Sequence, residues 1–291
     1  MATTYPIQRW QVGGARITRV VEIEGDSPGT FFFRDATPEK LLQHAWLKPR
    51  FLTDAGRVIA AIHAFVIESA GKVIVVDTCV GNDKPREVKG WHMRKGRFLE
   101  DLAEAGFPRE RVDLVVCTHL HVDHVGWNTM LMDGRWVPTF PNARYLIGRA
   151  EWAFWKDEAA GPDRAIRDDS VRPVLDAGLA DLVEPTHALT PEVRLEPTPG
   201  HTPGHVSVRI DSGGASAVIT GDLLHHPVQC AEPGWASNFD NDPDEARATR
   251  RAFLARYADG RTLVLGTHFA TPAGGRLVAE GGAWRFVAGH M

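Results

Sequence analysis

Three histidines and one aspartate lie in a single run of six residues, 119–124, which reads HLHVDH. Imidazole nitrogen and carboxylate oxygen are ligands that suit zinc, manganese, iron or cobalt. In an extended backbone alternate side chains point the same way, so we expect His119, His121 and Asp123 to converge. His124 follows at once and can serve a second, adjacent ion. Because these ligands exceed what one ion needs from one segment, the run predicts two metal ions.

Polar residues also follow several short apolar runs elsewhere in the chain. The runs at 73–76, 114–116, 218–219 and 263–265 end shortly before Asp77, His119, Asp222 and His268 respectively. Sites in sheet-containing enzymes commonly gather at strand ends, where rigid elements aim side chains into a cleft. Four such ends in one chain predict a site assembled from several strands.

These motifs, in this order, resemble the signature of the metallo-β-lactamase fold superfamily. The matching segments are 119–124 (HxHxDH), 199–205 (PGHTPGH, the loop with a third histidine), 220–222 (TGD, the bridging aspartate) and 266–268 (GTH, the last histidine). Asp77, which ends the sequence VVD, matches an aspartate that supports the site from behind. The resemblance implies an αββα sandwich of two mixed sheets flanked by helices, with two metal ions at one edge.

The resemblance also implies how the ligands divide between the ions. His119, His121 and His201 would hold one ion, Asp123, His124 and His268 the other, and Asp222 would bridge them. The expected cofactors are two divalent ions per chain, with Zn²⁺ favoured and Mn²⁺, Fe²⁺ or Co²⁺ compatible with the same ligands. The metal pair would lower the pKa of a bridging water and supply hydroxide at neutral pH.

Three residues are the candidates for a catalytic role. Asp222 would hold the two ions together, and Asp123 could also carry a proton to the leaving group. His225 stands where the best-known acyl-homoserine lactonases have a tyrosine that binds the lactone. It could donate a hydrogen bond to the substrate, or it could pack beside the site; the sequence leaves both alternatives open.

The substrate class follows from the branch that the chain resembles. The run GDLLH at 221–225 is more similar to the methyl parathion hydrolase-like branch than to the strict lactonases. The resemblance therefore implies a zinc-dependent hydrolase that opens a lactone or cleaves an aryl ester or phosphoester. Two alternatives stay open: a glyoxalase II-like thioester hydrolase, which needs cations for the glutathione carboxylates, and a non-catalytic metal-containing sensor or binding protein.

Aromatic residues favour a hydrophobic small-molecule substrate, because ligand pockets are mostly apolar. The candidates are Phe31, Phe32, Phe33, Trp91, Trp127 and Trp235. Three consecutive aromatics in a loop cannot all face one core, so we expect part of 31–33 at a pocket mouth or a dimer interface. Among the other histidines, we expect His205 to bind a loop carbonyl and His63 to lie in the core or a pocket wall.

The elements that must position these residues alternate between β-branched runs and helical patterns, which predicts an α/β architecture. Strands are predicted at 16–21, 58–68, 72–77, 113–118, 144–148, 206–210, 215–220 and 262–267. Helices are predicted at 38–46, 96–105, 151–156 and after Asp242, where Pro243 occupies the first helical position. The gap between 58–68 and 72–77 is too short for a helical crossover, so this pair should be antiparallel.

Composition limits the remaining possibilities. A chain of 291 residues with 43% hydrophobic residues suits one domain over 1–291, with 1–55 as an N-terminal extension that contributes to a pocket or a homodimer. A net charge of -4 argues against nucleic acid as a partner. The sequence shows no signal peptide and no apolar run long enough to span a membrane. Three widely separated cysteines fit a cytoplasmic protein.

Overall fold

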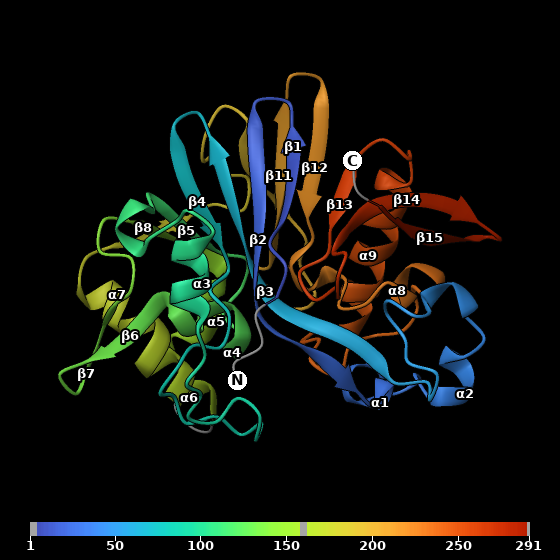
Figure 1. Cartoon of the computed structure of the whole chain (residues 1–291), viewed down its shortest axis with the longest axis horizontal. Helices are drawn as coiled ribbons and strands as arrows, with labels where there is room; N and C mark the ends of the chain where they lie inside the picture. The colour runs from blue at the N-terminus through green and yellow to red at the C-terminus, as the bar shows by residue number, and fades with distance from the viewer. Residues whose placement is uncertain (1–4, 158–161, 290–291) are drawn as a thin grey trace.

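Seven strands form a first mixed sheet in the computed structural model, which describes residues 5–157 and 162–289 (Figure 1). In spatial order the strands are β1 (Gln8–Val12), β2 (Ala15–Ser27), β3 (Val58–Ser69), β4 (Lys72–Val76), β5 (Leu114–Cys117), β8 (Arg144–Gly148) and β9 (Ala180–Val183). Pairing is antiparallel from β1 to β4 and parallel from β4 to β9. The antiparallel pairing of β3 with β4, predicted from their short connection, is confirmed.

Six strands from the C-terminal part of the chain form a second mixed sheet. In spatial order they are β10 (Val193–Pro197), β11 (Val206–Ser212), β12 (Ala215–Ile219), β13 (Leu263–Leu265), β14 (Gly274–Glu280) and β15 (Ala283–Ala288). Only the pair β12 and β13 is parallel among the pairings of this sheet that the described residues form. A separate hairpin joins β6 (Thr129–Met132) to β7 (Arg135–Pro138).

Helices surround the two sheets. They are α1 (Gly29–Phe32), α2 (Pro38–Leu41), α3 (Phe98–Glu104), α4 (Val122–Val125), α5 (Arg149–Trp155), α6 (Pro162–Ile166), α7 (Arg172–Asp176), α8 (Val228–Ala231) and α9 (Pro243–Tyr257). In Figure 1, α3, α5 and α7 lie beside the first sheet, and α9 lies beside the second. The molecule is therefore the predicted αββα sandwich. None of the helices within the described ranges is long and apolar enough to cross a membrane.

Two hydrophobic clusters explain why the strands stack in this way. Ile74 and Val76 of β4 belong to the cluster between the sheets, whereas Val73 and Val75 belong to the cluster on the helix side. Side chains alternate between the faces of a strand, so a strand buried on both faces reads as a continuous apolar run. Such runs supplied most of the strand predictions.

The helix expected at 38–46 is wrong in its extent. Its first turn forms α2, capped by the side chain of Thr37, and the chain then leaves the helix and forms a separate 3-10 turn at Ala45–Leu47. The long helix α9 begins as predicted, because the Asp242 carboxylate accepts hydrogen bonds from the backbone N–H groups of Asp244 and Glu245.

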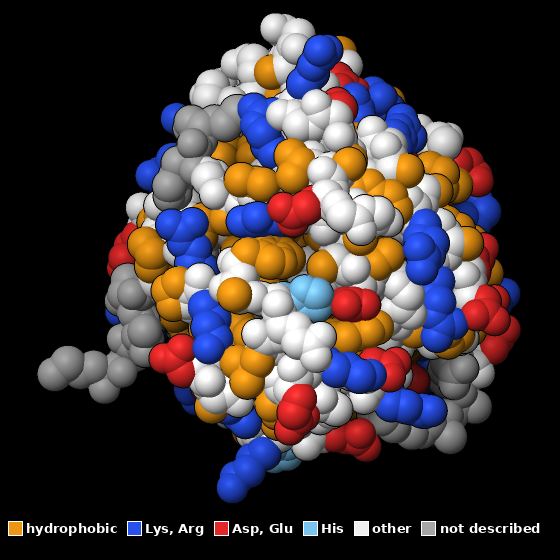
Figure 2. All heavy atoms as spheres, turned by 90° about the vertical axis from the view of Figure 1, so that its right-hand side faces the viewer, with side chains coloured by type: hydrophobic (Ala, Val, Ile, Leu, Met, Phe, Trp, Pro, Cys, Tyr) orange, Lys and Arg blue, Asp and Glu red, His pale blue; other side chains and the backbone are white. Residues whose placement is uncertain are grey.

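The face shown in Figure 2 carries charges of both signs. Lysine and arginine side chains intermingle with aspartate and glutamate, and hydrophobic side chains lie between them. On this face, therefore, no single charge dominates the surface.

Candidate metal centre

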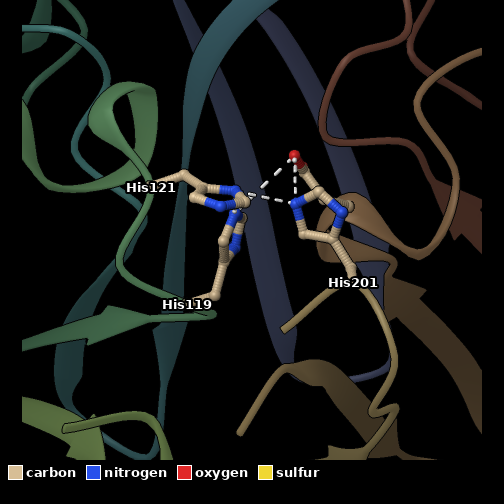
Figure 3. A group of neighbouring side chains, drawn as sticks. His119, His121 and His201 are labelled. Atoms are coloured by element: carbon tan, nitrogen blue, oxygen red, sulfur yellow. Dashed lines mark hydrogen bonds and ion pairs between the residues drawn. The ribbon is translucent and has the colours of Figure 1, made fainter. Parts of the chain in front are cut away.

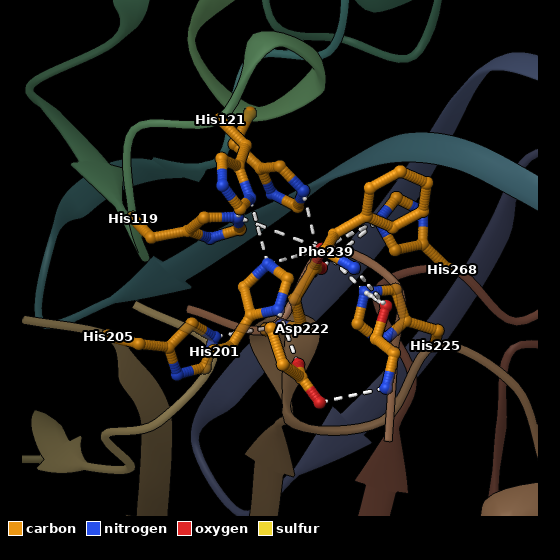
Figure 4. A network of polar contacts seen from close by, with 12 residues as sticks. His119, His121, His201, His205, Asp222, His225, Phe239 and His268 are labelled. Carbon is orange, nitrogen blue, oxygen red and sulfur yellow. Dashed lines mark hydrogen bonds and ion pairs between the residues drawn. The ribbon is translucent and has the colours of Figure 1, made fainter. Parts of the chain in front are cut away.

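The structure brings all seven predicted metal-binding residues together at the ends of several strands. They form two groups that could each hold an ion: His119, His121, His201 and Asp222 in the first, and Asp123, His124 and His268 in the second. His119 lies just after β5, Asp222 just after β12 and His268 just after β13. The residues come from distant parts of the sequence, and only the fold makes them neighbours (Figure 4).

Three imidazole nitrogens of the first group point at a common position (Figure 3). The Nδ1 atom of His121 lies 3.0 Å from Nε2 of His119 and 2.8 Å from Nε2 of His201. Asp222 Oδ2 lies 3.4 Å from the same His201 nitrogen. Nitrogens that share one tetrahedral zinc ion, each bound at about 2.0 Å, lie roughly 3.3 Å apart. The spacing therefore suits a single ion.

The other oxygen of Asp222 belongs to the second group. Asp222 Oδ1 lies 3.2 Å from His124 Nε2 and 3.1 Å from His268 Nε2. The carboxylate of Asp123 lies 3.6 Å from that His268 nitrogen. His268 Nε2 also lies 3.3 Å from Asp222 Oδ2. The carboxylate thus has Oδ2 beside the first group and Oδ1 nearest the second, which suits a residue that bridges two ions.

The backbone of the ligand segment differs from the extended conformation expected for 119–124. His121 is the last extended residue, with φ -64° and ψ 160°, and the helix α4 begins at Val122. Successive residues of a helix turn by about 100° around its axis, so Asp123 and His124 are carried away from the direction of His121. This turn delivers them to the second group, whereas an extended strand would have pointed Asp123 at the first.

Buried acceptors fix the outer nitrogens of these histidines. His124 Nδ1 lies 2.9 Å from Asp77 Oδ2, and His201 Nδ1 lies 2.9 Å from Asp240 Oδ1. His268 Nδ1 lies 2.9 Å from the backbone oxygen of Ala61. A carboxylate or carbonyl can only accept, so each outer nitrogen carries the proton and donates. The inner Nε2 atoms then direct their lone pairs into the centre.

The electrostatics of the centre also suit bound cations. Burial lowers the pKa of His119 and His201 well below the usual value, and it lowers the pKa of His121 to about 4. These three imidazoles are therefore neutral, as metal ligands must be. Burial alone would lower the pKa of His124 and His268 too, but Asp222 and neighbouring carboxylates raise the pKa of His124 and bring that of His268 to about 9, so an ion there must displace protons. Among the described residues, the buried atoms His124 Nε2 and Asp222 Oδ1 have no hydrogen-bond partner although they lie 3.2 Å apart. Both aim at the same point, and a cation there would satisfy both.

Asp77 and His205 hold the ligands from behind. Asp77 Oδ1 accepts a hydrogen bond from the backbone N–H of Thr118 at 2.8 Å, and its Oδ2 binds His124. His205 Nδ1 lies 2.9 Å from the backbone oxygen of Thr198, which confirms the expected bond to a loop carbonyl. His205 Nε2 also accepts from the backbone N–H of Asp222 at 2.8 Å. It therefore holds the backbone of Asp222, from which the shared carboxylate extends.

Glu151 and Asp240 are two supporting residues that the sequence interpretation missed. Buried Glu151 on α5 accepts hydrogen bonds from the backbone N–H groups of Leu120 and Gly204, both at 3.0 Å. It thereby links the loops that carry His119 and His201. Its only sequence signal is an acidic residue directly before the aromatic-rich run at 152–155. Asp240, which binds His201, follows no motif.

Replacing Glu151 with glutamine should loosen the junction of these two loops. The amide group would present N–H donors to backbone N–H groups, so at least one buried hydrogen bond would be lost at about 1–3 kcal/mol. We expect that loss in the free energy of unfolding in urea, together with about 10-fold to 100-fold weaker zinc binding. Glu184→Gln, on the exposed surface near α5, is the control. Unchanged stability and zinc affinity would contradict this role.

A cavity of about 1070 Å³ opens onto the metal centre. His121, Asp123, Asp222, His225 and His268 line it at the centre, and apolar side chains such as Phe31, Phe32, Ile62, Trp91 and Phe239 line much of the remainder. Residues of the N-terminal segment 23–32 thus form part of the wall. The cavity gives a substrate direct access to the shared carboxylate.

Three of the six aromatic candidates lie away from this cavity. Trp127 is buried, stacks on Phe98 and donates from Nε1 to the buried Glu22 carboxylate at 2.8 Å. Trp235 and Phe33 pack against each other in the core, with ring centroids 6.3 Å apart. These residues are large enough to fill the space under the loops, so their burial serves packing. These three candidates therefore do not line the cavity.

His225 lies beside the shared carboxylate (Figure 4). Its Nε2 atom is 3.2 Å from Asp222 Oδ2 and 3.4 Å from the hydroxyl of Ser237. Its ring lies near the rings of Phe32 and Phe239, with centroid distances of 6.5 and 6.4 Å. His225 therefore touches both the metal-binding group and the apolar wall.

Known proteins resemble this chain in sequence and in fold. The sequence profile described as Metallo-beta-lactamase superfamily matches residues 60–268. An N-acyl homoserine lactonase of a Bacillus species is 29% identical over 123 residues, which cover 42% of each chain. A probable metallo-hydrolase of Mycobacterium tuberculosis is 25% identical over 185 residues, which cover 56% of this chain and 57% of that protein. The chain thus spans less than half the length of the lactonase that it matches.

Two solved structures share the fold over almost the whole chain. A hydrolase described as AbOPH, in the beta lactamase superfamily, superposes with a TM-score of 0.82 at 24% identity and covers 99% of both chains. AidC, described as a dizinc quorum-quenching lactonase, superposes with a TM-score of 0.78 at 21% identity over 98% of both chains. At these identities the likeness establishes the shared architecture.

Proposed function

The chain belongs to the metallo-beta-lactamase superfamily, and we propose that it is a dinuclear metal-dependent hydrolase of uncharged lactones or esters with an apolar substituent. The division of the two Asp222 oxygens between two ligand groups is the observation that carries this proposal. The apolar cavity that reaches the same carboxylate supports the substrate class.

The residues of the centre have distinct roles in the proposed reaction. One ion would be held by His119, His121 and His201. The other would be held by Asp123, His124 and His268, and Asp222 would bind both ions. When bound, the ions would lower the pKa of a shared water and polarise the carbonyl or phosphoryl oxygen of the substrate. The carboxylate of Asp123 lines the cavity and would pass a proton to the departing oxygen.

The charges of the cavity favour a neutral substrate over a glutathione thioester. Arg86 is the one lysine or arginine among the described residues that line it. Its guanidinium is buried and engaged by both oxygens of Asp169, at 2.7 and 2.9 Å. Carboxylates of a glutathione moiety would therefore lack a free cation at this wall and would meet Glu87 and Asp163 instead.

A hydrolysis panel tests the proposed function. Purified protein with its metal content quantified would be assayed on lactones, p-nitrophenyl esters, phosphotriesters and S-lactoylglutathione. We expect turnover of lactones or esters that exceeds turnover of the glutathione thioester by at least tenfold. Preference for the thioester would contradict the proposed substrate class. Tight ligand binding without turnover across the panel would favour the sensor alternative.

A variant of His225 separates its two possible roles. We propose that its Nε2–H donates to the reacting oxygen or to Asp222, so His225→Leu should lower kcat by about 100-fold, as expected for one lost donor at a developing charge. Metal content should stay at the unmodified level, because His225 belongs to neither ligand group. If kcat stays within threefold, His225 only packs beside the site.

Phe32 offers a test of the apolar wall. Phe32→Ala removes aromatic area from the cavity, so binding of a long acyl chain should weaken by about 1.5 kcal/mol, which is roughly a tenfold rise in KM. KM for a short-chain substrate should change less than twofold. Leu131→Ala, at an exposed position outside the cavity, is the control. Equal effects on long and short chains would show that the wall does not bind the chain.

A further inference from the structure

An arginine lies on the buried face of α9, where the neighbouring positions are apolar. Ala246, Phe253, Leu254 and Tyr257 form this face, and Arg250 lies among them with its side chain 0% exposed. Burying a guanidinium costs several kcal/mol unless its donors are bound. Its partners should therefore indicate what this position does.

The guanidinium of Arg250 reaches three backbone carbonyls and one carboxylate. Its Nε donates to the oxygen of Leu223 at 2.9 Å. Its Nη1 donates to the oxygens of Pro233 and Trp235 at 3.3 and 3.1 Å. Its Nη2 lies 3.5 Å from Asp240 Oδ2 in a fully buried ion pair. A single side chain thus joins α9 to two loops.

Both loops carry parts of the metal centre. Leu223 directly follows Asp222, whose oxygens face the two ligand groups. Asp240 accepts from His201 Nδ1 at 2.9 Å, and its other oxygen accepts from the backbone N–H of Ser237 at 2.8 Å. Arg250 therefore lies one residue away from the shared carboxylate and one side chain away from His201.

The second ligand group is supported by different residues. His124 binds Asp77, and His268 binds the backbone oxygen of Ala61; Arg250 contacts neither of these partners among its recorded bonds. A change at Arg250 should therefore reach the group that contains His201 first.

We propose that Arg250 is a positioning residue of the metal centre, which sets zinc affinity at the group of His119, His121, His201 and Asp222 by holding Asp240 behind His201 and Leu223 beside Asp222. It neutralises the buried Asp240 carboxylate through the 3.5 Å ion pair, while Ser237 N–H fixes the direction of the same oxygen, so the imidazole of His201 keeps its inner lone pair on the ion. The inference rests on the proposed two-metal centre.

Zinc affinity, measured by competition with a chelator, tests this inference without relying on turnover. Arg250→Met should raise one of the two zinc dissociation constants by about 10-fold to 100-fold and the other by a clearly smaller factor, because Asp222 is shared by both positions. Asp77→Asn removes the charge directly behind His124 and reaches His119 only through the Thr118 hydroxyl, so it should raise the other dissociation constant more and thereby identify it. Arg209→Met is the matched control, because Arg209 also lies beside α9, where its Nη1 binds the Tyr257 hydroxyl at 2.9 Å.

Two further variants keep the test decisive if Arg250→Met does not fold. Arg250→Lys retains a charge but cannot reach all four acceptors. It should therefore raise the same zinc dissociation constant, by a smaller factor than Arg250→Met. Asp240→Asn should raise that zinc dissociation constant as well. In a folded Arg250→Lys, Asp240→Asn double variant, the loss should stay below the product of the two single losses, because the residues act through one contact.

The outcomes separate this inference from the proposed function. Zinc dissociation constants within twofold of the unmodified values in folded Arg250 variants would overturn it. An equal loss of zinc affinity in Arg209→Met would also overturn it, as would a double variant whose loss of affinity equals the product of the two single losses. If unmodified protein bound fewer than two zinc ions, the two-metal centre itself would fail. If the unmodified protein bound two zinc ions and the Arg250 variants bound them with the same dissociation constants, only the proposed role of Arg250 would fail.

Discussion

Replacing Asp222 with alanine is expected to lower turnover by at least about 1000-fold, equivalent to roughly 4 kcal/mol of transition-state stabilisation. Each of its oxygens faces a different ligand group, at 3.2 Å from His124 Nε2 and 3.4 Å from His201 Nε2. Alanine would remove a ligand from both positions and leave five imidazoles and one carboxylate. We expect the zinc content of the purified variant to fall below that of the unmodified protein by about one ion per chain.

Asp26→Ala provides the matched control for this variant. Asp26 lines the same cavity, but its exposed carboxylate pairs with Arg57 and belongs to neither ligand group. Its loss should change kcat less than threefold. Metal content and steady-state rates would be measured on both variants. An Asp222→Ala protein that kept its zinc and a tenth of its turnover would contradict the role of the shared carboxylate.

Removal of metal with a chelator should abolish turnover and also destabilise the fold. Ions that bind only the folded state contribute about 2.7 kcal/mol each when their free concentration is 100 times the dissociation constant. Without them, the buried cluster of five histidines and two aspartates loses the cations that compensate its carboxylates and hold its ligands together. We expect a lower unfolding temperature and less than 1% of the original activity, estimated from the loss of the only source of activated water.

Reconstitution gives this prediction its control. Zn²⁺ should restore both activity and unfolding temperature, whereas Mg²⁺, which prefers oxygen ligands, should restore neither. Thermal unfolding and activity would be followed during the same titration. Full activity in protein shown to be free of metal would rule out the proposed mechanism.

Local patterns made the ligands predictable from the sequence. The six residues from His119 to His124 carry four ligands without an intervening loop, and His201, Asp222 and His268 follow glycine-containing turns near apolar runs. The metal-binding candidates could therefore be named before the fold was known. The conformation of the segment could not, because the turn into α4 is fixed by contacts such as the bond from Thr78 N–H to the oxygen of His124.

Supporting residues were hidden because their partners are far away in the sequence. Asp240 lies 39 residues after His201, and Glu151 lies 53 residues before Gly204. No periodicity records a contact at such a distance. Arg250 was invisible for another reason: an arginine in an amphipathic helix is normally assigned to the solvent side.

Strands whose sequence mixes apolar and polar residues were also missed. The edge strands β1, β9, β10 and β15, the neighbouring strand β14 and the hairpin β6–β7 were not predicted. For example, β10 has a buried, exposed, buried beginning and then a half-buried glutamate. Strands buried on both faces, such as β4, were found because their apolar runs are continuous. The sequence thus indicated most of the central strands, whereas the edges of both sheets and β14 became clear only in the structure.

A crystal structure of the zinc-loaded protein with anomalous diffraction measured at the zinc edge tests the central claim most directly. We expect two peaks about 3.5–4 Å apart, one bound by Asp222 Oδ2 with His119, His121 and His201, and one bound by Asp222 Oδ1 with Asp123, His124 and His268. A single peak, or two peaks that do not share Asp222, would contradict the proposed two-metal centre.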